Sequence, residues 1–200
     1  MNKIIKDALV LFLITLISGV LLGSAYYITK TPIERQELEK KKQAYEKVLE
    51  NAKEFEEMDI TSIDNIAQIE AEYNVTIQGV ANGIDESGNE CGKAIYVNTH
   101  EGYGGDIIFI VGIDNTGTIT GLEIVTISET ANIGMKANED LFKNQFAGKK
   151  GEKINYVSGA TSNEDEITAI SGATITTKAV TSGVNAAITL YNSLGGASNE

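Results

Sequence analysis

Hydrophobic and polar residues follow different patterns in successive parts of the chain, and the first is a continuous apolar run. Residues 8–29 contain no charged residue and are mostly apolar. A helix of about 20 such residues crosses the roughly 30 Å hydrocarbon core of a bilayer. Gly23-Ser24-Ala25 resembles a signal-peptide cleavage site, but the run exceeds the ~7–15 apolar residues typical of a signal peptide. We therefore predict a retained transmembrane anchor over residues 1–30.

The next part of the chain carries the signals of a helix start and then helical periodicity. Thr31 can cap a helix, Pro32 suits its first position and Glu34 completes a capping box. Apolar residues then recur at helical spacing among many Lys and Glu residues. We predict a helix from Thr31 to about Met58, then a loop and a short helix near residues 66–73. The apolar stripe fits either a stalk packed on its own domain or a helix that binds a partner.

From Val75 onward the pattern alternates with the period of β-strands. We predict strands at residues 75–80, 93–99, 106–113 and 118–127, a short helix over residues 137–146, and a last strand at residues 154–157. The turn Asp114-Asn115-Thr116-Gly117 joins two of these strands. Short turns between successive strands indicate an antiparallel meander, so the predicted fold class is α+β, with an N-terminal transmembrane helix and a helical stalk. The corresponding divisions are a stalk over residues 31–72, a domain over residues 73–195 and a tail over residues 196–200.

The final apolar pattern is an amphipathic helix that follows a run of small and hydroxyl-bearing residues. Its apolar face includes Val180, Val184 and Ile188, and the run before it is Ser171–Thr177. The first N–H groups of a helix have no partner within the helix, and the helix dipole favours an anion there. This start therefore suits a phosphate-bearing cofactor. A simple helix cap is the alternative, because Ser and Thr are common at such positions.

Composition and charge exclude several classes of function. The formal charge of −12 is uneven, since residues 1–50 carry a net +2 and residues 51–200 a net −14. An acidic domain repels nucleic acid, so we predict no nucleic-acid partner. A single cysteine, Cys91, excludes an internal disulfide and an iron–sulfur cluster held by this chain alone, and the lone His100 argues against a zinc site. We therefore assign no metal site, and no catalytic residue, because no nucleophile–base pair or carboxylate dyad stands out.

The tetrapeptide Ser-Gly-Ala-Thr occurs twice, at residues 158–161 and 171–174. An acidic loop that includes Glu164 and Asp165 follows the first copy, and nearby carboxylates repel a phosphate. The long amphipathic helix follows the second copy and has Lys178 in its first turn. Only the second copy therefore combines free N–H groups, a helix dipole and a cation, so we choose Thr174 over Thr161 as the site residue.

The string Ser-Gly-Ala-Thr-x-Thr-Thr before a helix resembles the flavinylation motif of the FMN-binding domain family. This family includes the G subunit of the Rnf electron-transport complex and the C subunit of the sodium-translocating NADH:quinone reductase. The resemblance implies that Thr174 carries FMN covalently through a phosphoester bond. The family often has aspartate three residues before the serine, where this chain has Thr168. That departure weakens the predicted recognition by a flavin transferase.

Two further segments resemble this family. Residues 101–107 resemble its Gly-rich entry to the third strand, and residues 128–135 resemble its Glu-Thr-Pro-Gly-Leu-Gly loop, with Ala131 and Asn132 in place of proline and glycine. Asparagine tolerates a positive φ, so the turn can persist. The predicted cofactor-binding residues are Thr174 with Ser171, Gly172, Ala173, Ile175, Thr176, Thr177 and Lys178, together with Tyr103, Gly104, Gly105, Glu129, Thr130 and Gly134.

The resemblance implies a membrane-anchored electron-carrier subunit of an Rnf-type complex, which couples electron transfer between ferredoxin and NAD to Na⁺ or H⁺ translocation. Its expected partners are other membrane and redox subunits and, during maturation, the flavin transferase. The expected topology has a cytoplasmic N-terminus and an extracytoplasmic domain. Positive charges lie on both sides of the span and do not settle this orientation. The alternatives are the C subunit of the quinone reductase and an anchored interaction module without a flavin.

Overall fold

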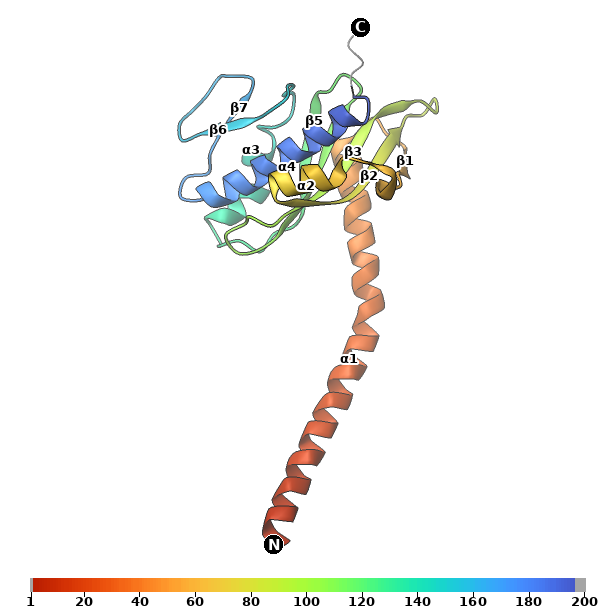
Figure 1. The fold of residues 1–200 in the computed structure, drawn as a ribbon, viewed down its shortest axis with the longest axis vertical. Coiled ribbons are helices and arrows are strands. Elements are labelled where there is room, and N and C mark those ends of the chain that lie inside the picture. The colour runs from red at the N-terminus through yellow and green to blue at the C-terminus, as the bar shows by residue number, and fades with distance from the viewer. Residues whose placement is uncertain (1, 197–200) are drawn as a thin grey trace. The chain divides into compact units, whose positions relative to one another are not determined.

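The computed structural model describes residues 2–196, which fall into two compact units that meet between Lys41 and Lys42 (Figure 1). Helix α1, Asn2–Val48, accounts for the first unit and extends into the second. It is the one helix among the described residues that is long and apolar enough to cross a membrane. Its apolar side chains in the span are exposed, as a lipid-facing helix requires.

The predicted helix start at Thr31 is wrong, because α1 passes through this position without a break. Pro32 lies inside the helix, where it removes one backbone hydrogen bond. One turn earlier, the Thr29 hydroxyl donates to the Ala25 carbonyl at 2.9 Å. Pro32 is exposed on the surface of α1. The local sequence signals for a helix start at Thr31 and Pro32 therefore do not interrupt the helix.

The predicted end of this helix near Met58 is also wrong. Helix α1 ends at Val48, and residues 54–57 form strand β1, Glu54–Glu57. The Thr120 hydroxyl donates to the Val48 carbonyl, which would otherwise lack a partner at the helix end. Leu49 and Ala52 are buried in the second unit, so their helical spacing reflects contact with the sheet and not continuation of the helix.

The central sheet confirms the predicted antiparallel meander, with strand order β1-β2-β3-β4-β5. The other strands are β2, Val75–Ile84; β3, Glu90–Thr99; β4, Ile107–Asp114; and β5, Ile119–Thr126. The strands β2 and β3 are longer than predicted and extend into the segment between the two predicted strands. Gly83 is among them, and a Cβ there would lie 3.0 Å from Leu49 Cδ1, so the missing side chain lets residues after α1 approach the sheet.

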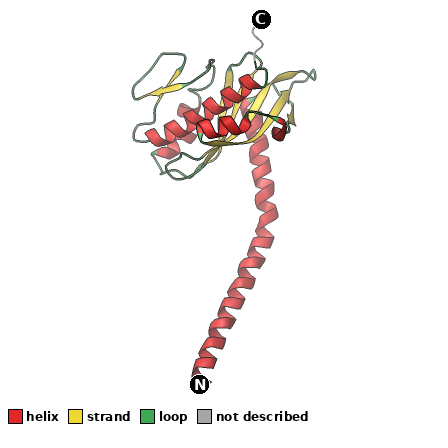
Figure 2. Ribbon diagram, viewed as in Figure 1, coloured by secondary structure: helices red, strands yellow, loops and turns green. Residues whose placement is uncertain are grey.

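Each face of the sheet has its own apolar cluster. One face packs against α4, Thr174–Ser193, which lies beside α2, Ile66–Tyr73 (Figures 1 and 2). A Cβ at Gly183 of α4 would lie 2.5 Å from Phe109 Cζ, so a glycine is required for this close packing. The other face is covered by the last turns of α1 through Ala44, Tyr45 and Val48. The α+β prediction and the short helix at residues 66–73 are confirmed.

The segments between β5 and α4 are short. They comprise η2, Gly134–Asn138; α3, Asp140–Lys143; β6, Asn155–Val157; and β7, Glu166–Thr168. A further 3-10 turn, η1, Ile60–Ser62, precedes α2. The predicted helix over residues 137–146 is thus interrupted, and the strand at residues 154–157 is not the last. Strand β6 instead pairs in parallel with β7 in a separate two-stranded sheet.

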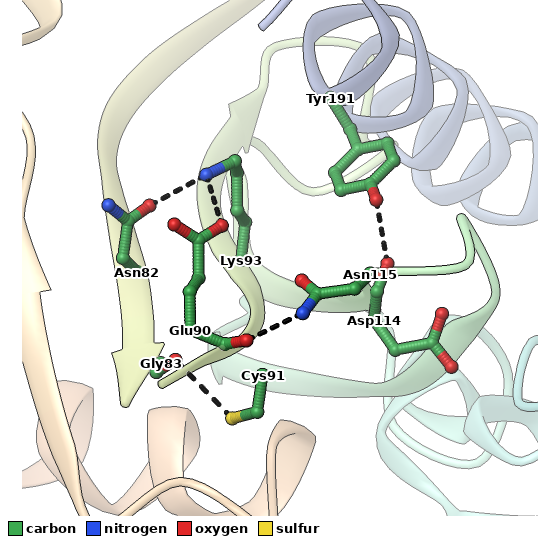
Figure 3. Close-up of polar contacts among 8 residues, drawn as sticks. All are labelled: Asn82, Gly83, Glu90, Cys91, Lys93, Asp114, Asn115 and Tyr191. Carbon is green, nitrogen blue, oxygen red and sulfur yellow. Dashed lines mark hydrogen bonds and ion pairs between the residues drawn. The ribbon is translucent and has the colours of Figure 1, made fainter. Parts of the chain in front are cut away.

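A hydrogen bond anchors the C-terminal end of α4 to the β4–β5 hairpin, and another joins that hairpin to the β2–β3 hairpin (Figure 3). The Tyr191 hydroxyl donates to the Asp114 carbonyl at 2.8 Å, and Asn115 donates from Nδ2 to the Glu90 carbonyl at 2.6 Å. Lys93 Nζ contacts Glu90 Oε1 at 2.6 Å. The Tyr191 hydrogen bond therefore holds α4 at its C-terminal end.

We predict that the Glu123 carboxylate stabilises the domain through its two lysine partners. It lies 2.7 Å from Lys143 Nζ and 2.6 Å from Lys47 Nζ. Burial raises the pKa of Glu123, but the hydrogen bonds and charges of Lys143 and Lys47 outweigh burial and lower it. Because the folded-state pKa is below the ordinary value, the stabilisation is present above that value and is lost as pH falls through the folded-state pKa.

Glu123→Gln is therefore expected to lower the free energy of unfolding by about 1–3 kcal/mol at pH 7, between the values for exposed and buried pairs. Circular dichroism of the detergent-solubilised chain during denaturation measures this difference. The difference in unfolding free energy between Glu123→Gln and the parent should shrink at acidic pH. A difference that does not depend on pH would mean that the variant acts through packing and not through the charge of Glu123.

Candidate cofactor site

The N-terminal turn of α4 is open to a ligand. Ala173 occupies the N-cap position and makes no side-chain capping hydrogen bond. The turn before it depends on Gly172, which has φ of +79°, a conformation that favours glycine. The Ala173 N–H donates to the Ile170 carbonyl at 2.9 Å and closes the turn. The first N–H groups of α4 therefore point out of the helix without a capping side chain.

The four threonine and serine hydroxyls in this region have different surroundings. Thr177 is fully buried, donates to the Ala173 carbonyl at 3.0 Å and accepts from the Ile170 N–H at 3.1 Å, so it shapes the turn. Thr176 is also buried, whereas Thr174 and Ser171 are exposed. Within residues 2–196, the Thr174 hydroxyl has no hydrogen-bond partner. Thr174 is thus the hydroxyl on this helix turn that is open to chemistry.

A cavity of about 490 Å³ adjoins this helix turn. Three segments that are distant in sequence line it: the loop after β3, the loop after β5 and the start of α4. The lining residues are Tyr103, Glu129, Thr130, Ile133, Gly134, Gly172, Ala173, Thr174, Ile175 and Thr176. Its volume is in the range of small-ligand pockets, ~300–1,000 Å³. Most of the predicted cofactor-binding residues are therefore brought together.

The two loops are locked against each other on one side of the cavity. The Glu129 carboxylate accepts the Tyr103 N–H at 2.7 Å. A Cβ at Gly134 would lie 2.6 Å from Glu129 Oε2 and 2.9 Å from Thr176 Oγ1, so a side chain would push into the carboxylate and the helix turn. At the other loop, a Cβ on Gly104 would collide with the Ser128 carbonyl. Glycines are needed here because the loops and the helix start approach closely.

Some predicted residues do not line the cavity. Ser171 faces a neighbouring cavity of about 510 Å³, and Gly104 and Gly105 lie in the loop without reaching the lining. Thr177 supports the turn from the interior. Lys178, expected to face a phosphate, instead lies 3.2 Å from the Glu101 carboxylate.

Sequence reasoning missed one lining residue and anticipated one backbone feature. Ile133 lines the cavity and is 44% exposed, although its side chain is large and apolar. An apolar residue in an otherwise polar loop is the signal that could have identified it. Asn132, next to it, has φ of +61°, in agreement with the tolerance of asparagine for this conformation.

In the first Ser-Gly-Ala-Thr copy, the threonine hydroxyl is already hydrogen-bonded. Thr161 donates its hydroxyl hydrogen to Glu166 Oε2 at 2.6 Å and accepts the Asn163 N–H at 3.1 Å. The next regular element is the three-residue strand β7, not a helix. The Thr161 oxygen is therefore committed to its own loop and lies beside a carboxylate, which disfavours a phosphate.

The residues of the cavity fit a ligand with a phosphate and an aromatic ring. Free N–H groups at the start of a long helix suit the phosphate, and the side chains of Ile133, Ile175 and Tyr103 give apolar surface for a ring. Thr174 belongs to the same lining and is exposed.

Comparison with known proteins identifies the family of the domain that contains this cavity. Residues 102–189 match the FMN-binding domain family, and residues 1–48 match the RnfG N-terminal region. Over 194 residues the chain is 34% identical to the G subunit of the Na(+)-translocating ferredoxin:NAD(+) oxidoreductase complex of Acetobacterium woodii, covering 96% of this chain and 93% of that protein. The chain belongs to the RnfG family. All cavity-lining residues of this RnfG-family protein fall inside the FMN-binding domain match.

Other similar proteins agree with this assignment. The G subunit of the Clostridium ljungdahlii proton-translocating ferredoxin:NAD(+) oxidoreductase complex is 28% identical over 172 residues, covering 86% of this RnfG-family chain and 83% of that protein. The crystal structure of the C subunit of the Na(+)-translocating NADH-quinone reductase from Parabacteroides distasonis superposes with a TM-score of 0.57. It has 17% sequence identity and covers 80% of this chain and 94% of that chain, so it shows a shared fold alone.

Proposed function

We propose that this chain is the membrane-anchored flavoprotein subunit of an Rnf-type complex, in which it carries electrons on a route between ferredoxin and NAD that is coupled to ion translocation. The observation that carries the proposal is the unpartnered Thr174 hydroxyl at the open start of α4, in a cavity of the FMN-binding domain. The 34% identity over nearly the whole chain to an RnfG-type protein supports this assignment over the C subunit of the quinone reductase.

The proposed cofactor is FMN, joined to Thr174 Oγ1 by a phosphoester bond. The N–H groups of Ile175 and Thr176 would bind the phosphate oxygens, and the loops that carry Tyr103 and Glu129, which line the cavity, would border the ring. When bound, a flavin supplies both one-electron and two-electron transfer, while the protein supplies position and electrostatics. A covalent bond would keep the cofactor from diffusing away from its domain.

We expect a flavin transferase to form this bond. The Thr174 oxygen bonds to phosphorus and the hydroxyl loses its proton. Because condensation with free FMN would have to expel water, the donor is expected to be a flavin phosphoanhydride whose second phosphate leaves. The exposure of Thr174 supports access by a separate enzyme.

The surface around the cavity suits approach by redox partners. The large apolar side chains that are exposed within residues 42–196 are Tyr103, Ile133, Leu141, Tyr156 and Ile175. Three of them line the cavity and Leu141 lines the neighbouring cavity. Such a gathering of exposed apolar side chains marks an interaction surface. It supports a function in which electrons enter and leave through contacts with other proteins and not through a small substrate.

The similar proteins differ in the ion that their names specify. The Acetobacterium woodii protein is named for Na⁺ translocation, and the Clostridium ljungdahlii protein for proton translocation. We therefore propose that the complex couples electron transfer to the translocation of Na⁺ or H⁺. The cofactor and the anchor are tested together by intact mass of the detergent-purified chain. A mass increased by one FMN less one water, with the N-terminal helix retained, is expected, and an unmodified mass would favour an interaction module without a flavin.

We further propose that the N-terminus is cytoplasmic and the domain extracytoplasmic. The test is a single introduced cysteine, Ser87→Cys, in the tight loop between β2 and β3, in a Cys91→Ala background. A membrane-impermeant maleimide should label it in intact cells as fully as in lysed cells. Labelling only after lysis would place the domain in the cytoplasm, and the Cys91→Ala chain without the introduced cysteine controls for other thiols.

A further inference from the structure

The loop of residues 101–105, which we call the strap, places Tyr103 at the cavity. Tyr103 lines the cavity but is 70% exposed, so burial contributes little to holding its side chain. The strap contains Gly102, Gly104 and Gly105, and Gly105 has φ of +129°. Glycines give a loop more conformational freedom than other residues do. The position of Tyr103 must therefore depend on bonds from the strap to its surroundings.

Three sets of contacts hold the strap. At its C-terminal base, Asp106 accepts from Asn98 Nδ2 at 2.9 Å and lies 3.1 Å from His100 Nδ1. In its middle, the Tyr103 N–H donates to Glu129 at 2.7 Å. At its N-terminal end, Glu101 lies 3.2 Å from Lys178 Nζ in the first turns of α4. Of the three, only the Glu101–Lys178 contact connects the strap to the helix that carries Thr174.

This contact changes the role expected of Lys178. A cation in the first turns of a helix opposes the helix dipole, so it needs a compensating partner. Lys178 has such a partner in Glu101, and it does not line the cavity that contains Thr174. The Glu101 side chain is 30% exposed and that of Lys178 57% exposed, so the pair lies at the surface and is screened by salt.

We propose that Lys178 and Glu101 are positioning residues that tether the strap to α4, and that the phosphate is held by helix N–H groups without the Lys178 charge. The tether sets the distance between Tyr103 and the Thr174 turn. This inference rests on the proposed cofactor site for its functional meaning, but the tether itself belongs to the protein and can be measured without a flavin.

The first experiment measures the tether in the full-length, detergent-solubilised Thr174→Ala chain, which lacks the proposed attachment atom. Hydrogen exchange of the strap amides is compared in Glu101→Gln, Lys178→Gln and the double variant. Each single variant should accelerate exchange about two- to fivefold, the range for one exposed ion pair, and the double variant should add no further acceleration. Lys178→Arg should exchange nearly as slowly as the parent. Raising the salt concentration should accelerate the parent and leave the Gln variants unchanged.

The second experiment uses the chain loaded with flavin and measures quenching of its fluorescence by acrylamide, a neutral probe. Both single variants should increase quenching equally, and Lys153→Gln, which removes one exposed positive charge elsewhere, should not. Unchanged strap exchange in the single variants would overturn the tether. A lower flavin yield in Lys178→Gln than in Glu101→Gln would overturn it too, because Lys178 would then act on the phosphate. Failure of flavin loading in the parent chain would reject the proposed function and leave the exchange result standing.

Discussion

Thr174→Ala is expected to abolish covalent flavin on this chain completely. The variant removes the one hydroxyl on the α4 turn that is exposed, lines the cavity and has no hydrogen-bond partner in residues 2–196. The neighbouring hydroxyls are not expected to replace it, because Thr177 is buried and hydrogen-bonded within the turn, Thr176 is buried, and Ser171 faces the neighbouring cavity. The measurement is flavin fluorescence in a denaturing gel after co-expression of the full chain with a flavin transferase.

The matched control is Thr161→Ala, which makes the same change in the other copy of the tetrapeptide. It should retain flavin, because the Thr161 hydroxyl is hydrogen-bonded to Glu166 and Asn163, and because Thr161 is followed by a strand and not by a helix. Thr174→Ser should retain at least part of the flavin, since it keeps the hydroxyl. Equal fluorescence of Thr174→Ala and the parent would refute the proposed attachment site, and loss in both alanine variants would point to transferase recognition of a wider segment.

Gly112→Val is expected to destabilise the domain by about 2–4 kcal/mol, the largest stability effect that we predict. Gly112 lies in β4 beneath the end of α1. A Cβ there would collide with the Val48 carbonyl and lie 2.5 Å from Thr120 Oγ1. The side chain would therefore force α1 away from the sheet and break the hydrogen bond from Thr120 to Val48. Overpacking costs about 1–3 kcal/mol, and a lost hydrogen bond about 0.5–1.5 kcal/mol.

Denaturation followed by circular dichroism, in detergent and on the full chain, gives this difference in unfolding free energy. Gly159→Ala is the control, because a Cβ at Gly159 meets no atom within 4 Å. It should change the free energy by less than about 0.5 kcal/mol. A neutral Gly112→Val variant would mean that the end of α1 does not pack on β4 in solution.

The periodic parts of the fold were predictable because their signals are local. The apolar run at residues 8–29 and the alternation after Val75 depend on neighbours within a few positions, and both gave the correct element type. The errors are also local in origin. Thr31 and Pro32 carry the signals of a helix start, yet the helix has already begun at Asn2. The apolar spacing after Val48 also predicts helix, because period alone does not show that Leu49 and Ala52 bury against a sheet.

The candidate site divides in the same way. Thr174 could be preferred over Thr161 from sequence because the following helix and the acidic loop are both adjacent in the chain. The roles of Lys178, Ile133 and Thr177 could not be predicted, since each depends on residues brought together by folding. Lys178 pairs with Glu101, which lies 77 positions away. Ile133 lines the cavity only when the loop after β5 meets the start of α4.

By itself, the sequence determined the long apolar N-terminal helix, the antiparallel meander and the helix after the second Ser-Gly-Ala-Thr copy, and it predicted Thr174 as the site residue. These follow from hydrophobic periodicity and helix-end chemistry, which act between residues close in the chain. The tertiary structure decided where α1 ends, which glycines allow close packing, and that three distant segments enclose one cavity. It also pairs Lys178, in the first turns of α4, with the Glu101 carboxylate of the strap. Those outcomes depend on long-range packing and charge pairing, whose partners are defined only once the sheet, α1 and α4 are assembled.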